Sequence, residues 1–204
     1  YGAETKPSAL AHDDEKVEAW FGEKRLKEKE YYLMVGRFVP ENNFETIIRE
    51  FMKSRSKKNL AIITTTNEQF MEELERKLHF GKDSRIRFTG TVYDQELLKK
   101  IREKAFGYVH GHEVGGTNPS LLEAMGSTQL NLLLDVGFNR EVGEDGAVYW
   151  EKTEGSLKRL IEKVEEMGAE EIQELGEKAR GRIRREYSWE RIAGRYEELF
   201  LAVE

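Results

Sequence analysis

The chain has 204 residues, of which 38% are hydrophobic, so folding can bury a core that hides roughly 70% of the unfolded surface. Its formal net charge is -6, and its basic residues alternate with acids, which argues against a general nucleic-acid-binding protein. The chain has no cysteine, which excludes disulfides and thiol nucleophiles and suits a reducing compartment, and it has no apolar run near the ~18 residues of a membrane span.

Short apolar runs alternate with amphipathic stretches over most of the chain. The predicted strands cover residues 31–35, 60–64, 86–89, 106–110, 130–134 and 147–150. Helices are predicted between them at 44–53, 70–78, 97–104 and 119–125. Continuously apolar strands are typical of a parallel sheet covered by helices on both faces. We therefore predict an α/β fold with a Rossmann-like doubly wound parallel sheet, and a ligand at the carboxyl ends of its strands near a topological switch point.

The two ends of the chain differ from this alternating series. After residue 150 only helical patterns follow, at 157–164 and 172–183, and then a last helix for which Ser188 is the predicted N-cap. Near the N-terminus, the run EKRLKEK at 23–29 is predicted to be a solvated helix face. We expect three parts, which are a linker segment at 1–12, one α/β domain at 13–187, and a C-terminal helix at 188–204 that reaches a neighbouring domain.

The stretch HGHEVGGTNPSLLEAMG at 110–126 joins a predicted strand to a helix. Asn118 is a favoured N-cap and Pro119 a favoured first helical residue, so the helix is predicted to begin there. Unpaired amides at a helix start, together with those of a flexible loop, can bind a phosphate. The loop residues concerned are Gly115, Gly116 and Thr117. The alternative is a glycine-rich turn that only reverses the chain.

Glu123 distinguishes these two interpretations. Its side chain leans back toward the start of the helix, where a carboxylate would repel a bare anion but could accept hydrogen bonds from two sugar hydroxyls. A corner with both features suits a phosphorylated sugar, such as the ribose and diphosphate of a nucleotide.

The stretch VGRFVPENN at 35–43 follows the first predicted strand. Gly36 lets the backbone turn, and Arg37 is placed at the carboxyl end of the sheet, where a guanidinium can hold a diphosphate. The alternative is a surface arginine paired with an acid such as Glu41. Neither a G-x-G-x-x-G fingerprint nor a P-loop occurs in the chain.

The histidines fall into two groups. His12 and His79 are predicted to lie on the surface, whereas His110 and His112 alternate out of a strand beside the expected ligand. We assign His110 to the binding site, with packing as the alternative. His110, His112 and Glu113 could form a metal cluster, but without a second such cluster we expect no metal.

The order of four segments resembles a known family. These segments are YYLMVGRFVPENNFETII, RIRFTGTVYDQELLKKI, GGTNPSLLEAMGS and YSWERIAGRYEELF. They resemble the donor-binding C-terminal half of retaining nucleotide-sugar glycosyltransferases with the GT-B fold. More narrowly, the sequence is similar to bacterial rhamnosyltransferases that build capsular and cell-surface polysaccharide.

The resemblance implies a role for each candidate residue. Arg37 would contact the diphosphate and Glu123 the ribose hydroxyls. The amides from Gly115 to Asn118 would contact the diphosphate or the sugar, and Glu113 is a candidate for the sugar contact. The base would lie against Thr91, Val92 and Tyr93. No catalytic nucleophile is identifiable.

The sequence departs from the family at two places. Asn42 and Asn43 stand where the family usually has a lysine after the proline and glutamate of the first loop, so one of two diphosphate cations is missing. The family also pairs two glutamates with seven residues between them, and counting back from Glu123 leads to Gly115. Whether Glu113, two residues earlier, takes that place is left open.

The resemblance implies an enzyme half that transfers a sugar, with rhamnose the sugar of the narrower match, from a nucleoside diphosphate to a glycan in surface polysaccharide synthesis. The nucleoside-diphosphate sugar is its donor substrate and no cofactor is expected. A glycan or lipid-linked acceptor would be held by an N-terminal domain outside this chain, and the enzyme would work in the cytoplasm or at the inner membrane face. The alternative is a non-catalytic nucleotide or sugar-phosphate sensing module, because a fold alone does not fix a function.

Overall fold

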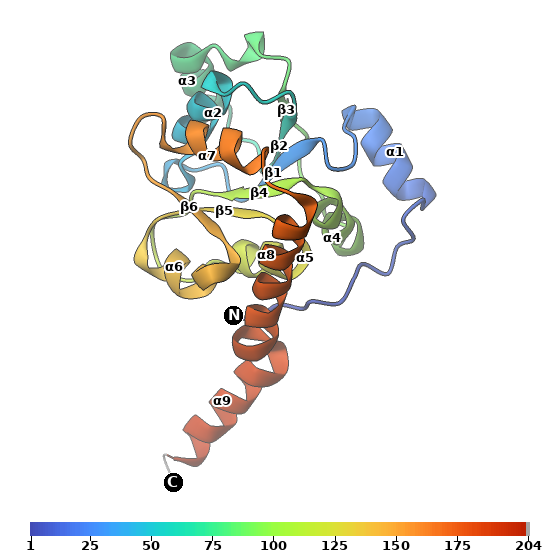
Figure 1. The fold of residues 1–204 in the computed structure, drawn as a ribbon, viewed down its shortest axis with the longest axis vertical. Coiled ribbons are helices and arrows are strands. Elements are labelled where there is room, and N and C mark those ends of the chain that lie inside the picture. The colour runs from blue at the N-terminus through green and yellow to red at the C-terminus, as the bar shows by residue number, and fades with distance from the viewer. Residues whose placement is uncertain (203–204) are drawn as a thin grey trace.

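The apolar runs form one sheet in the computed structural model, which describes residues 1–202. Within this part of the chain, six parallel strands lie in the order β3-β2-β1-β4-β5-β6 (Figure 1). The order reverses between β1 and β4, so the predicted doubly wound sheet with a switch point is confirmed. The strands are β1 (Tyr31–Val35), β2 (Asn59–Ile63), β3 (Ile86–Phe88), β4 (Gly107–His110), β5 (Asn131–Leu134) and β6 (Val148–Trp150).

Helices cover both faces of the sheet because alternate strand residues point to opposite sides. Tyr32 and Met34 of β1 are buried against one layer of helices, which contains α2 (Phe44–Lys53), α3 (Glu68–Leu78) and α7 (Ser156–Val164). Tyr31 and Leu33 are buried on the other face against α1 (Glu15–Lys24) and α4 (Gln95–Lys104). The rest of that second layer consists of α5 (Pro119–Ser127), α6 (Gly137–Gly143) and α8 (Ala169–Arg182) (Figure 1).

The N-terminal segment and the last helix lie together at one side of the domain. The amide of Ala3 donates to the Tyr187 carbonyl at 2.8 Å. Ser188 caps α9 (Trp189–Leu201), as predicted, by accepting from the Arg191 amide at 3.2 Å. The helix extends away from the rest of the chain (Figure 1) and none of its residues is buried. Its exposed side chains include Trp189, Tyr196, Leu199 and Phe200.

The prediction for residues 23–29 is wrong. Helix α1 ends at Lys24 because Arg25 takes a left-handed backbone conformation, with φ of 54°. Leu26 is buried, and the Lys29 ammonium donates to the carbonyl of Glu103 at 2.8 Å. The segment is therefore a connection from α1 to β1 that packs on the end of α4.

Two helices were missed because their sequence signals are weak. Helix α1 buries Val17 and Trp20, whose spacing of three residues was a usable signal inside a polar stretch. Helix α6 has only seven residues and a glycine at each end. Helices α3 and α4 begin two residues before their predicted starts at 70 and 97, because Asn67 and Asp94 are their N-caps.

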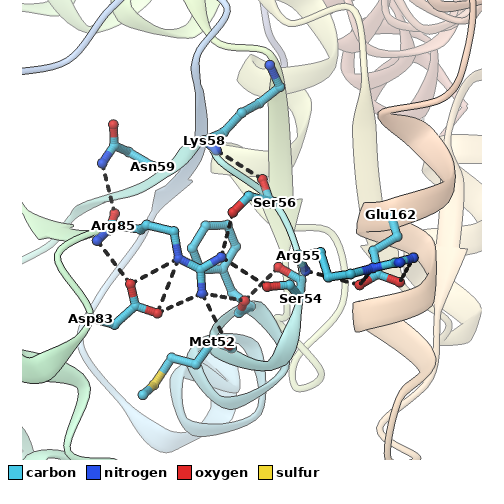
Figure 2. A network of polar contacts seen from close by, with 10 residues as sticks. Met52, Ser54, Arg55, Ser56, Lys58, Asn59, Asp83, Arg85 and Glu162 are labelled. Atoms are coloured by element: carbon cyan, nitrogen blue, oxygen red, sulfur yellow. Dashed lines mark hydrogen bonds and ion pairs between the residues drawn. The ribbon is translucent and has the colours of Figure 1, made fainter.

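Arg85 ties the end of α2 to the strand β3. Its guanidinium pairs with the Asp83 carboxylate at 2.7 Å, which lowers the pKa of Asp83, and it also lies 4.8 Å from the centre of the Phe51 ring. The same group donates to four carbonyls at the C-terminal end of α2 and just beyond it, where the last helix carbonyls lack intrahelical partners. These acceptors are Phe51, Met52, Ser54 and Ser56, at 2.7 to 3.3 Å (Figure 2). Of these, the Phe51 carbonyl also accepts from the Ser54 amide and hydroxyl.

We expect Arg85→Met to lower the free energy of unfolding by about 2 kcal/mol, because it removes a cation that satisfies several carbonyls at once. For a domain of this size the melting temperature should fall by roughly 4–8 °C. Arg55→Met is a matched control, since Arg55 pairs with Glu162 across the same region (Figure 2) but is 84% exposed. Its effect should stay within about 0.5 kcal/mol. Equal effects of the two substitutions in thermal melts would show that Arg85 does not stabilise the end of α2.

Candidate functional site

A cleft of about 440 Å³ opens at the carboxyl ends of β1 and β4, where the strand order reverses. Parallel sheets with helices on both faces bind ligands in this crevice. The loops after β1, β2 and β4 form its walls, together with α4 and the start of α5. Its lining includes Arg37, Asn42, Thr65, Thr91, Val92, Arg102, His110, His112, Asn118 and Glu123.

Arg37 lies in the cleft directly after β1. Within residues 1–202 no carboxylate forms an ion pair with its guanidinium, so the pairing with Glu41 that the sequence left open is not observed. The Arg37 carbonyl accepts a hydrogen bond from Asn42 Nδ2 at 2.7 Å, which fixes the backbone of the loop. The arginine head is therefore available to an anionic ligand.

Asn118 and Pro119 begin α5 as predicted. The Asn118 side chain accepts from the Ser120 amide at 2.8 Å, and the Asn118 carbonyl accepts from the Leu121 amide at 3.1 Å. Because the cap already uses these amides, the helix start offers fewer donors to a phosphate than the sequence pattern indicated.

The glycine segment at 115–117, in the loop before α5, does not line the cleft. Gly115 and Gly116 have φ values of 86° and 92°, which glycine adopts without strain. Neither these two residues nor Thr117 lies on the cleft wall in this conformation. Their proposed contact with the ligand thus requires the loop to approach the cleft.

Glu123 has a partner that the sequence analysis missed. The Arg102 guanidinium lies 2.6 Å from Glu123 Oε2, and the Arg102 side chain is 4% exposed whereas that of Glu123 is 43% exposed. Arg102 follows Leu98 by four residues on the buried face of α4, a spacing that indicates a buried arginine but does not identify its partner. The pair fixes one carboxylate oxygen, and Glu123 Oε1 has no hydrogen-bond partner within residues 1–202.

His110 is buried at the end of β4 and lines the same cleft. Burial, with a smaller effect of nearby His112, lowers the pKa of His110 to about 3, so the ring is neutral near pH 7. Its Nδ1 lies 3.4 Å from the Tyr108 hydroxyl, which in turn lies 3.0 Å from Ser120 Oγ. His110 Nε2 has no hydrogen-bond partner among the described residues. The neutral ring can orient polar groups but does not contribute a positive charge.

The remaining candidates are spread around the cleft. Thr91 and Val92 line it, whereas Tyr93 is 85% exposed and lies on a separate shallow depression beside α1. Glu113 is not on the cleft wall, and its carboxylate lies 3.0 Å from the Lys152 ammonium. Across residues 1–202, no three His, Asp or Glu side chains converge to ligate a metal ion, and no helix is long and apolar enough to cross a bilayer.

Comparisons with known proteins identify a matching family and several solved structures with a similar fold. A family model described as glycosyl transferases group 1 matches residues 16–182. No curated protein matches the sequence. A glycosyltransferase from Rickettsia africae is similar in structure, with a TM-score of 0.85 at 14% identity, over 98% of this chain and 55% of the other.

Two further structures have the same fold. The Anabaena protein Alr3699/HepE, solved in complex with UDP, has a TM-score of 0.78 at 14% identity, over 91% of this chain and 52% of the other. Sucrose-phosphate synthase from Thermosynechococcus elongatus has a TM-score of 0.79 at 19% identity, over 99% of this chain and 51% of the other. The chain therefore spans about half the length of these proteins.

Proposed function

The chain belongs to the glycosyl transferases group 1 family, and we propose that it is the donor-binding half of a retaining enzyme that transfers a sugar from a nucleoside diphosphate to a glycan. The observation that carries this proposal is the placement of Arg37 and Glu123 in one cleft at the switch point of the sheet. A guanidinium suits a diphosphate, and a carboxylate held by Arg102 suits ribose hydroxyls. Rhamnose as the transferred sugar and surface polysaccharide as the product are part of the proposal through the sequence resemblance.

The chemistry assigned to these residues is positioning and charge stabilisation. As the bond between sugar and diphosphate breaks, negative charge gathers on the leaving phosphate, where Arg37 can stabilise it. Glu123 would fix the ribose, and through it the place of the anomeric carbon. The acceptor would be held by a second domain, since the chain spans half of its structural neighbours. We propose that the exposed apolar face of α9, with Trp189 and Phe200, packs against that domain.

The test is a binding titration of this chain with dTDP-rhamnose, UDP-glucose and GDP-mannose. We expect one of them to bind with a dissociation constant between micromolar and millimolar, or about 4–8 kcal/mol, because half of the enclosing cleft is absent. Amide chemical shifts should change at Arg37, Val92 and Glu123. Absence of binding at millimolar concentration, or shift changes confined to another surface, would refute the donor site. A nucleotide that binds equally well without its sugar would instead favour a sensing module.

A further inference from the structure

His112 lies two residues beyond the end of β4, and its ring is on the wall of the donor cleft. Its Nδ1 is 2.8 Å from Asn42 Oδ1. Asn42 Nδ2 donates to the Arg37 carbonyl, so Oδ1 must be the atom that faces the ring and it can only accept. The hydrogen of the neutral imidazole is therefore on Nδ1, and a ligand would meet Nε2.

This arrangement couples His112 to the loop that carries Arg37. Asn42 holds the ring on one side and the Arg37 backbone on the other. On the far side, Asn139 Nδ2 donates to the His112 carbonyl at 3.1 Å and fixes the backbone. The imidazole and the Arg37 guanidinium thus belong to the same wall of the cleft, at the position proposed for the diphosphate.

The charged groups around His112 act in opposite directions. Burial lowers its pKa, hydrogen bonding to the Val114 backbone raises it, the Arg37 cation lowers it, and the carboxylates of Glu41 and Glu113 raise it. Glu113 is itself paired with Lys152, and the neighbouring His110 is neutral near pH 7. The net effect is a lowered pKa, so without a ligand the ring is mostly neutral at pH 7.

We propose, on the basis of the proposed donor site, that His112 acts as a second cation for the diphosphate. When the sugar nucleotide binds, Nε2 of His112 takes up one proton from solvent. The diphosphate of a sugar nucleotide carries two negative charges, and Arg37 can neutralise only one of them. An anion beside the ring favours its charged form and raises its pKa in the complex. The imidazolium then donates Nδ1–H to Asn42 and Nε2–H to a phosphate oxygen, which takes the place of the Val114 backbone as a partner of the ring.

The direction of the pH dependence follows from this shift. A group whose pKa is higher in the complex than in the free protein strengthens binding. This contribution is complete when the pH is below the pKa of the free protein. That contribution is lost as the pH rises through the pKa of the complex. We therefore expect tighter binding at pH 6 than at pH 8. A rise of one pKa unit can strengthen binding tenfold at most, and about a few-fold of that gain should appear between these two pH values.

The experiment is calorimetry of the whole chain with dTDP-rhamnose, UDP-glucose and GDP-mannose at pH 6 and pH 8. These probes are diphosphate diesters that do not titrate in this range, unlike a nucleoside diphosphate, whose terminal phosphate has a pKa near 6. Measuring each binding heat in two buffers of different ionisation enthalpy counts the protons taken up. At pH 7 we expect uptake of a substantial fraction of one proton. The His112 ring carbon shifts, followed by NMR, should report a higher pKa with the probe than without it.

Three variants separate charge from structure. His112→Gln keeps a donor for Asn42 but cannot be protonated, so it should match the wild type at pH 8 and lose the gain at pH 6. His112→Lys is charged throughout, so its affinity should be high and nearly independent of pH. His79→Asn is the matched control, because His79 is exposed at the end of α3 and does not line the cleft. Its backbone is left-handed, a conformation that asparagine tolerates. It should keep the pH dependence of the wild type.

The outcomes distinguish this inference from the function on which it rests. Binding without proton uptake, or an unchanged pH dependence in His112→Gln, overturns the role of His112 and leaves the donor site intact. If no probe binds at millimolar concentration at either pH, the donor site fails and His112 fails with it. Ring shifts of His112 in the wild-type protein decide the question if a variant does not fold.

Discussion

Glu123→Gln is expected to weaken sugar-nucleotide binding about tenfold or more without unfolding the domain. Arg102 can only donate hydrogen bonds, so the new amide must turn its oxygen toward Arg102 and its NH₂ group toward the ligand. The ribose hydroxyls then lose an ionised acceptor, whose hydrogen bonds are worth roughly 1.5–3 kcal/mol each. Since 1.4 kcal/mol corresponds to a factor of ten, loss of one such bond gives the expected change.

Glu123→Ala should differ from Glu123→Gln in stability. Alanine leaves the Arg102 guanidinium, which is 4% exposed, with no acceptor, and the Arg102 Nε already has none among the described residues. A buried charge without a partner is costly, so the melting temperature should fall by several degrees. Calorimetry and thermal melts on both variants separate binding from folding. The control is Glu23→Gln, which removes an exposed carboxylate of α1 and should change neither.

Unchanged affinity in Glu123→Gln would show that this carboxylate does not contact the ligand. A large loss of stability in the same variant would show that Glu123 is needed for the fold. Either result leaves the other cleft residues to be assigned again.

The sequence predicted those features that depend on neighbours along the chain. Runs such as YYLMV predicted parallel strands that are buried on both faces of the sheet, because every residue of β1 packs against a hydrophobic layer. The start of α5 follows from Asn118 and Pro119, because capping is a local interaction. The location of the cleft then follows from the reversal of strand order at β1 and β4.

The features that the sequence did not predict depend on contacts between distant residues. Arg102 and Glu123 are 21 residues apart on different helices, and nothing local marks them as a pair. Arg85 reaches carbonyls more than 28 residues away, at the far end of α2. Long side chains can reach many partners, and only the packing of the helices selects one. For the same reason, the run at 23–29 looked like a helix face although it packs against α4.

The cleft also depends on a close approach between the loops after β1 and β4. The Gly111 carbonyl accepts from Asn43 Nδ2 at 2.7 Å, and the Glu113 amide donates to the Glu41 carbonyl at 3.3 Å. A Cβ atom on Gly111 would overlap the Asn42 carbonyl oxygen and lie 2.8 Å from Ile47 Cδ1. The backbone carbonyl cannot rotate away as a side chain can, so the two loops must separate.

Gly111→Ala is therefore expected to lower both stability and affinity. Overpacking of this kind costs about 1–3 kcal/mol, and the melting temperature of a domain of this size should fall by roughly 2–12 °C. Separation of the loops moves Arg37 away from His112 and Glu123, so sugar-nucleotide affinity should fall more than tenfold. Thermal melts and calorimetry measure the two effects on the same protein.

Two glycine controls make the result specific to the cleft. Gly22→Ala lies on an exposed turn of α1 with nothing within 4 Å of the new Cβ, so it should stabilise the helix by about 0.5–1 kcal/mol. Gly146→Ala would place its Cβ 2.7 Å from the Ala179 amide nitrogen, away from the cleft, so it should destabilise the fold without changing affinity among folded molecules. If Gly111→Ala behaves like Gly146→Ala, the approach of the two loops supports the fold but does not hold the ligand-binding groups in place. If it behaves like Gly22→Ala, the two loops adapt without cost and the cleft does not depend on their contact.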